Sequence, residues 1–362
     1  MSSLRLVLFG IICAAASQIV CAETRKFVVS WVYYAVSSRD GDCPGGLNPD
    51  SVGIFRRILK ERNTPPDKIE QFVADFPNSA AVADIGHRGS IDGKPADVYR
   101  YPTSVPDPHL HHVQGTYGLG FDLDGKIGRD DFVDPLTGEK GVDNQFFKAI
   151  GCSSQMRAPV GQPGVYQAVQ YDEVRDSQPA WLVEISGIDS LEKSDNVKVH
   201  VMLAREPVAR DVTGAPQADM TFHVDPVTRT AGNVVRGTIR NGLLTTYKFN
   251  FYMPGEPRIQ AEYDFKDARL RFQFMPNGTL KGYIGGYQDW RSVYASIALA
   301  GITYELLASY DTPGMFYAFR ELADAYPDPK TGQNTRISST YATDAIPAFI
   351  VEPSALQTAE AK

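Results

Sequence analysis

The chain has 362 residues, of which 43% are hydrophobic and 11% aromatic, and this composition is typical of a globular protein with a packed core. It carries 36 Lys and Arg against 43 Asp and Glu, which gives a formal net charge of -7 and a pI near 5.4. Nucleic acids and anionic membranes are bound by basic surfaces, so we expect no nucleic acid as a partner.

The N-terminus has the pattern of a secretory signal peptide over residues 1–22. An apolar run from Leu6 to Ala16 is followed by the small-residue pattern Val20-Cys21-Ala22, which predicts cleavage after about Ala22. We therefore expect a periplasmic or secreted protein that begins near Glu23. No later apolar run approaches the roughly 18 residues that a membrane-spanning helix needs, so no transmembrane segment is predicted.

Removal of the signal peptide leaves Cys43 and Cys152 as the only cysteines of the mature chain. Two cysteines in an oxidising compartment are expected to form a disulfide bond. The loop that they close has about 110 residues, for which the chain-entropy model gives on the order of 4 to 5 kcal/mol of stabilisation. Two free buried thiols are the alternative.

Residues 23–165 are predicted to form a loop-rich N-terminal region with two short helices. Phe27–Ala35 is rich in β-branched and aromatic residues, which predicts a strand. One helix begins at the capping sequence Asn48-Pro49-Asp50-Ser51, and a second spans Pro66 to Phe76. Residues 77–165 are rich in Gly, Pro and Asp, which predicts irregular structure.

The only histidine cluster of the sequence is Pro108-His109-Leu110-His111-His112. In an extended segment, alternation places His109 and His111 on the same side. Together with a carboxylate such as Asp107, or with His87, these two imidazoles could hold zinc or copper. Surface histidines without a metal are the alternative.

Residues 120–131 (GFDLDGKIGRDD) reproduce most of the calcium-binding loop of an EF-hand. That loop places oxygen ligands at positions 1, 3, 5, 7, 9 and 12, with a glycine at position 6. With Gly125 at position 6, the predicted ligands at positions 3, 5, 7 and 12 are Asp122, Asp124, the Lys126 carbonyl and Asp131. Position 1 is a glycine, and Asp143 is expected to supply the ligand that is missing there.

The segment from Asp122 to Asp143 is also strongly acidic, with seven acids against three bases in 22 residues. Such a density of carboxylates repels itself unless a cation lies among them. The sequence therefore predicts calcium as the bound ion. Magnesium fits less well because its smaller shell prefers water and phosphate ligands. A solvated acidic turn without an ion is the alternative.

Residues 166–289 are predicted to form an antiparallel β-sandwich or jelly-roll-like domain, which makes the fold class mainly β with flanking helices. Short alternating runs are separated by turns, and Pro276-Asn277-Gly278 is a hairpin signal because Asn and Gly tolerate positive φ angles. The predicted strands are Trp181–Ser186, Val197–Leu203, Asp219–Val224, Asn233–Arg240, Leu244–Met253, Ile259–Phe265, Arg269–Met275 and Thr279–Tyr287.

Residues 290–362 are predicted to form C-terminal helices and a tail that pack on the rest of the protein. The helices span roughly Trp290 to Ser309 and Gly314 to Tyr326. A last apolar segment, Ala345–Val351, follows them.

A series of motifs along the mature chain resembles a family of secreted proteobacterial proteins. The resemblance implies secretion, and members of that family are sometimes encoded near c-type cytochromes, which points to a periplasmic oxidative system. The resemblance assigns no catalytic residue. The motifs are CPGGLNP (43–49), PDP (106–108), GFDLDG (120–125), GVDNQ (141–145), GC (151–152), GGY (285–287) and DPKTGQ (328–333).

The sequence contains no Gly-x-Ser-x-Gly elbow, no His-Glu-x-x-His helix and no nucleotide or phosphate loop. The absence of Cys-x-x-Cys-His excludes covalent c-type haem. A jelly-roll glycosidase needs two inward carboxylates, and the acids available on predicted strands are Glu184, Glu262 and Asp264. Alternation places Glu262 and Asp264 on one face of their strand. The solvent-exposed face of an ordinary half-buried strand would show the same pattern of acids.

The sequence thus predicts a secreted or periplasmic, calcium-stabilised accessory or ligand-binding protein without its own active site. One alternative is an extracellular polysaccharide hydrolase, for which Glu184, Glu262 and Asp264 would have to converge in one cleft. The other is a metal-dependent periplasmic redox accessory protein that uses the histidine cluster. The sequence does not predict the ligand, a partner protein or the oligomeric state.

Overall fold

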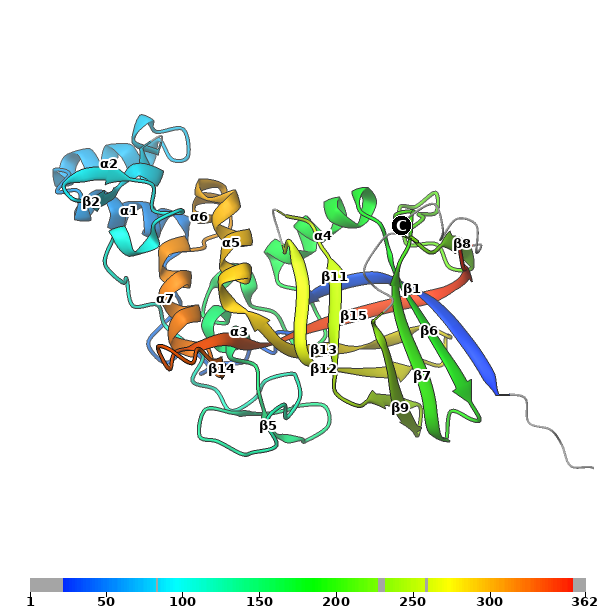
Figure 1. The fold of residues 1–362 in the computed structure, drawn as a ribbon. Helices are drawn as coiled ribbons and strands as arrows, with labels where there is room; N and C mark the ends of the chain where they lie inside the picture. The colour runs from blue at the N-terminus through cyan, green and yellow to red at the C-terminus, as the bar shows by residue number, and fades with distance from the viewer. Residues whose placement is uncertain (1–21, 83, 227–231, 258–259, 354–362) are drawn as a thin grey trace, which may run out of the picture.

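The computed structural model describes residues 22–82, 84–226, 232–257 and 260–353, and nearly all of the predicted signal peptide lies outside these ranges. Its centre is an antiparallel sheet that closes into a ring in the order β1-β6-β7-β9-β10-β12-β13-β15, with β15 paired to β1 (Figure 1). These strands are Glu23–Tyr34, Trp181–Ile188, Lys193–Leu203, Val234–Arg240, Leu243–Thr246, Glu262–Phe274, Leu280–Asp289 and Asn334–Val351.

The predicted fold class is confirmed as mainly β with flanking helices, since strands hold 36% of the residues and helices 23%. The eight-stranded barrel replaces the predicted sandwich of two facing sheets. The reason is that β1 and β15, both outside the segment 166–289, pair with each other from Phe27–Pro347 to Tyr34–Tyr341. Three of the predicted regions therefore contribute strands to the barrel.

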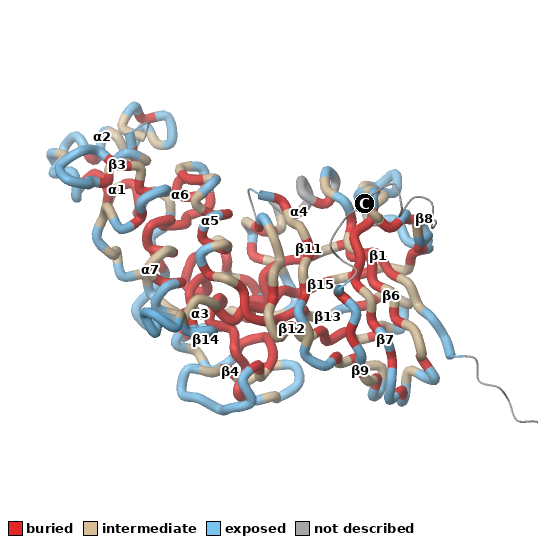
Figure 2. The backbone as a smooth tube through the Cα atoms, in the orientation of Figure 1, coloured by how far each residue is buried: buried red, intermediate tan, exposed pale blue. Residues whose placement is uncertain are grey.

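The barrel interior is filled by apolar side chains at alternate strand positions, as the pleat of a strand requires. On β7, Val197, Val199, Val201 and Leu203 are all buried in one core cluster. The same cluster continues into the helices through Trp290 and other aromatic residues. Figure 2 shows buried chain in the barrel strands and in the helices beside them.

Helices α1, α2, α5, α6 and α7 gather at one end of the molecule, and β15 runs from there across the barrel to β8 (Figure 1). The helices α1 to α7 are Ser51–Glu61, Pro66–Ala74, Gln145–Ile150, Val165–Ser177, Trp290–Ala300, Ile302–Leu307 and Thr312–Leu322. The remaining strands β2, β3, β4, β5, β8, β11 and β14 are Gly89–Ile91, Lys94–Ala96, Phe132–Val133, Lys140–Val142, Met220–His223, Phe249–Pro254 and Ala325–Pro327.

Several predicted strand boundaries differ from the observed ones. The predicted strand Leu244–Met253 is two strands, β10 and β11, and both pair with β12. The two strands predicted between 259 and 275 are one long strand, because a register shift between Lys266 and Arg269 lets β12 continue along β13. The hairpin at Asn277-Gly278 is confirmed, with Gly278 at φ +84°.

Two features of the helices were also unexpected. The helix predicted over 290–309 is broken by Gly301, whose φ of +48° ends α5 and lets α6 begin in a new direction. Helix α4 lies where no helix was predicted, because its sequence VYQAVQYDEVRDS mixes polar and apolar residues on every face. Helix α4 packs on β1 at one end of the barrel.

The predicted disulfide bond is confirmed. Cys43 and Cys152 are bonded at an S–S distance of 2.03 Å and close a sequence separation of 109 residues. The bond ties the segment after β1 to the end of α3, and the main chain supports the same contact because the Asn48 N–H donates to the Cys152 carbonyl at 2.9 Å.

A buried ion pair holds the N-terminal segment against the C-terminal helices. Arg88 donates to both carboxylate oxygens of Glu305 on α6, at 2.6 and 2.9 Å, and the Tyr99 hydroxyl donates to the same carboxylate at 2.8 Å. The side chains of Arg88 and Glu305 are only 4% and 0% exposed, so each charge depends on the other for compensation.

We expect Arg88→Leu to lower the free energy of unfolding by about 3–5 kcal/mol, because it leaves the Glu305 carboxylate buried without its counter-charge. Urea unfolding followed by circular dichroism measures the change. The matched control is Arg56→Leu on α1, whose partner Glu70 has a side chain that is 66% exposed. Loss of that surface pair should cost less than about 1 kcal/mol. Equal losses in both variants would contradict the role given to the buried pair.

Candidate functional site

The acidic loop lies on the outer face of the barrel and is anchored there by arginines of β12. Arg271 pairs with Asp134 at 2.9 Å and also with Glu139, and its guanidinium lies over the ring of Phe121, 4.8 Å from the centroid. Asp130 likewise pairs with Lys148 at 2.8 Å, so at least three of the seven acids are paired with protein cations. The charge excess in the loop is smaller than the sequence suggests.

Phe121 packs the acidic loop against the outer face of the barrel sheet. Its ring is fully buried against Gly285 of β13, where a Cβ atom would lie only 2.7 Å from the ring. Real side chains do not approach so closely, so the sequence needs a glycine at this strand position. This packing, together with the bridge between Phe121 and Asp143, places Asp122 and Asp124 beside Asp143 on the outer face of the barrel.

Asp122, Asp124 and Asp143 converge, with one carboxylate oxygen of each within 4.8 Å of the others. Each carboxylate accepts a main-chain N–H of the loop: Asp122 from Gly125 at 2.6 Å, Asp124 from Lys126 at 2.8 Å and Asp143 from Leu123 at 2.7 Å. These bonds fix the positions of the three carboxylates, and among the described residues the one basic side chain that the structure pairs with them is Lys126, whose ammonium lies 3.5 Å from Asp124. Hard oxygen ligands at this spacing suit calcium.

The other two predicted ligands lie differently. Asp131 is outside the converging group and accepts the N–H of Gly128. The carbonyl oxygen of Lys126 lies against Gly141, and the Lys126 ammonium lies 3.5 Å from Asp124. The structure thus brings together three of the five predicted calcium ligands, which are Asp122, Asp124 and Asp143.

The charge state of Asp143 reflects this crowding. Its pKa is raised from 3.8 to about 7, mainly by burial and in smaller part by the nearby carboxylates of Asp324, Asp124 and Asp131, while the hydrogen bond from Leu123 opposes the shift. Asp143 is 6% exposed. A divalent cation beside these oxygens would favour the ionised form.

We expect calcium to raise the melting temperature of the wild-type protein relative to chelator. At calcium about a hundredfold above Kd, the gain in unfolding free energy is roughly 2.7 kcal/mol. The double variant Asp122→Asn, Asp124→Asn should lose this difference in differential scanning calorimetry. Asp211→Asn is the matched control, because Asp211 is an exposed carboxylate that accepts a main-chain N–H at 2.8 Å in another loop. Superimposable wild-type curves with and without calcium would rule out the ion.

The raised pKa of Asp143 also predicts a pH dependence in chelator. A carboxyl group whose folded pKa lies above its unfolded value contributes stability at low pH, and this contribution is lost as pH rises through the folded pKa of about 7. Between pH 4 and pH 8, the unfolding free energy of the wild type should therefore fall relative to that of Asp143→Asn, by on the order of a few kcal/mol. A constant difference between the two proteins across this range would contradict the assignment.

The histidine cluster is not gathered around a metal site. His109 is exposed and lies 3.6 Å from Asp107, whereas the Nδ1 atom of His111 lies 2.8 Å from the carbonyl oxygen of Gly46. Burial lowers the pKa of His112. Within the ranges that the structure describes, the His, Cys, Asp and Glu side chains close enough to hold an ion are the three aspartates above.

The three strand acids do not share a cleft. Glu184 on β6 pairs with Lys26 at 3.3 Å, Glu262 accepts the Ser292 hydroxyl at 2.9 Å, and Asp264 lies 3.5 Å from Arg336. In the ring order, β6 and β12 are separated by β7, β9 and β10. Glu184 is therefore remote along the sheet from Glu262 and Asp264, and each of the three carboxylates has a partner within the protein.

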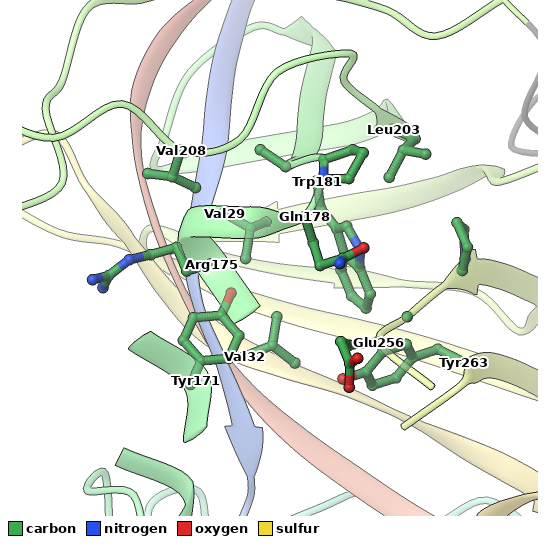
Figure 3. Close-up of a pocket in the computed structure, with 14 residues that line it drawn as sticks. Val29, Val32, Tyr171, Arg175, Gln178, Trp181, Leu203, Val208, Glu256 and Tyr263 are labelled. Atoms are coloured by element: carbon green, nitrogen blue, oxygen red, sulfur yellow. The ribbon is translucent and has the colours of Figure 1, made fainter. Parts of the chain in front are cut away.

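A site that the sequence did not reveal lies at one end of the barrel, where β6 begins and β7 ends. It is a partly open cavity of about 180 Å³, bounded on one side by Tyr171 and Arg175 of helix α4. Figure 3 shows Tyr171 of α4 on one side, Glu256 and Tyr263 on the other, and Trp181 above them. The apolar wall is formed by Val29, Val32, Pro179, Ala180, Leu203, Val208 and Pro254.

The aromatic side chains of this cavity are held by their neighbours. Trp181 packs perpendicular to Tyr263 with ring centroids 4.7 Å apart, and Tyr171 stacks on Trp31 at 5.0 Å. Burial raises the pKa of Tyr171 and of Tyr263, so both hydroxyls stay protonated. The cavity is therefore mostly apolar and supplied with few polar groups, as ligand pockets usually are.

Two charged side chains line the cavity, Arg175 of α4 and Glu256 after β11, and they are only 5% and 7% exposed. The guanidinium of Arg175 lies over the Trp31 ring, 5.0 Å from its centroid. Figure 3 shows it directed away from the cavity, on the far side of Tyr171 from Glu256. The carboxylate of Glu256 is thus the charge that faces a ligand.

Sequence reasoning missed this cavity because its lining comes from β1, α4, β6, β7, β11 and β12, which are far apart in the chain. No motif joins them. Tyr263 lies in the predicted strand Ile259–Phe265, but its place in the sequence does not indicate a cavity.

Comparison of the chain with protein-family models, curated proteins and solved structures finds no match. Within the described part of the chain, no helix is long and apolar enough to cross a membrane. The functional conclusion must therefore come from the two sites themselves.

Proposed function

We propose that the protein is a secreted or periplasmic ligand-binding protein, stabilised by calcium and without an active site of its own, whose ligand occupies the cavity at the end of the barrel. The observation that carries this proposal is the cavity itself, which is lined by aromatic and aliphatic side chains and bounded on one side by α4. Apolar pockets with a few polar groups are the usual form of small-molecule sites.

Calcium has a separate role in this proposal. Asp122, Asp124 and Asp143 belong to the loop on the outer face, and none of them lines the barrel cavity. The ion would hold the loop against the sheet, and so its effect would be on stability. The disulfide bond between Cys43 and Cys152 supports an oxidising compartment, in agreement with the predicted signal peptide.

We expect Val208→Phe to abolish ligand binding, because the larger ring fills the cavity that Val208 lines. A screen of small-ring compounds by ligand-observed NMR should give hits with the wild type that disappear in this variant. Val212→Phe makes the same substitution at a fully exposed position of the same loop and should keep every hit. A wild type that binds none of the compounds, or a Val208→Phe variant that binds all of them, would overturn the proposal.

A further inference from the structure

The volume of the barrel cavity limits its ligand to about one ring. An engineered apolar cavity of roughly 150 Å³ in another protein binds benzene, whereas pockets for drug-sized ligands have volumes of about 300–1,000 Å³. The cavity here has about 180 Å³. It therefore accommodates a monocyclic molecule with a small substituent, and it is too small for a haem, an oligosaccharide or a long acyl chain.

The walls favour an aromatic ring. Trp181, Tyr171 and Tyr263 present rings from three directions, and aromatic pairs gain about 0.5–1.5 kcal/mol beyond the burial of area. Between these rings the lining is branched and aliphatic, with Val29, Val32 and Leu203. A ring would contact carbon on these sides, while Gln178 and Glu256 supply polar groups on another.

The polar side of the cavity accepts hydrogen bonds. A carboxylate offers about four lone-pair sites, so Glu256 can accept an N–H or O–H from a ligand in addition to the interaction it makes within the protein. An anionic ligand would meet like charge in a desolvated space, which is costly. The group that the ligand presents to Glu256 is therefore a donor.

A smaller cavity of about 30 Å³ adjoins the larger one and shares Val32, Tyr171, Glu256 and Tyr263 with it. Tyr166 lines this smaller space, and its hydroxyl oxygen is buried without a hydrogen-bond partner in the described part of the chain. Buried polar groups are nearly always paired. A polar substituent of the ligand that extends beyond Glu256 into the smaller cavity would therefore find the Tyr166 hydroxyl as a hydrogen-bond partner.

We infer that the ligand is a single-ring aromatic molecule with a hydrogen-bond donor, of the phenol or arylamine class, whose ring lies among Trp181, Tyr171 and Tyr263 and whose donor points to Glu256. This inference rests on the proposed function, since it names the ligand class of the same cavity.

Titration calorimetry with phenol, aniline, toluene and benzoate on the full mature chain tests the inference. Phenol and aniline should bind with one-to-one stoichiometry and about tenfold or more tighter than toluene, because a hydrogen bond to a charged acceptor is lost in toluene. Glu256→Gln should weaken phenol by about tenfold and leave toluene unchanged. Circular dichroism checks that the Glu256→Gln variant is folded.

The outcomes separate the ligand class from the function. Toluene or benzoate binding as tightly as phenol, or a Glu256→Gln variant that binds phenol like the wild type, would overturn the ligand class. In that case the cavity would remain a binding site for another small molecule. Absence of binding for all four probes, with Val208→Phe indistinguishable from the wild type, would overturn the proposed function as well.

Discussion

The pairing of the first strand with the last strand is the interaction on which the rest of the structure depends. β1 and β15 meet from Phe27–Pro347 to Tyr34–Tyr341, and without this ladder the sheet would have two open edges instead of a closed ring. The contact joins residues more than three hundred positions apart in sequence, so folding must order most of the chain before the barrel closes. The Cys43–Cys152 bond and the Arg88–Glu305 pair both tie distant segments together. They therefore shorten the loop of chain that must close before β1 can pair with β15.

Closure also creates two different surfaces from the same strands. Inward side chains such as Val199 and Phe272 build the apolar core, while outward side chains such as Arg271 meet the acidic loop. Because side chains alternate along a strand, each barrel strand serves both surfaces at once. The cavity forms only at the end of the barrel where the interior side chains stop and α4 takes their place.

The sequence predicted what depends on local patterns. The strand character of the 181–287 region, the Asn277-Gly278 turn, the disulfide bond and the convergence of Asp122 with Asp124 all come from residues a few positions apart or from simple pairing rules. The sandwich was predicted because a run of eight strands suggests a self-contained sheet, whereas closure depends on β1 and β15, which lie far outside that run. For the same reason, the cavity was not predicted. Alternation along a strand shows which side chains point into the barrel, but it does not show which residues of other strands they contact.

The two sites share β12, and this explains how they differ in role. Tyr263, near the start of the strand, lines the cavity, whereas Arg271, eight residues later and on the outer face, anchors the acidic loop. A cation bound to Asp122, Asp124 and Asp143 would therefore act on the ligand only through the position of β12. A strand paired on both sides along the barrel resists displacement, because moving it breaks main-chain hydrogen bonds to its neighbours. In the proposed function, a bound cation would therefore stabilise the folded barrel, and the cavity walls would set the specificity for the ligand.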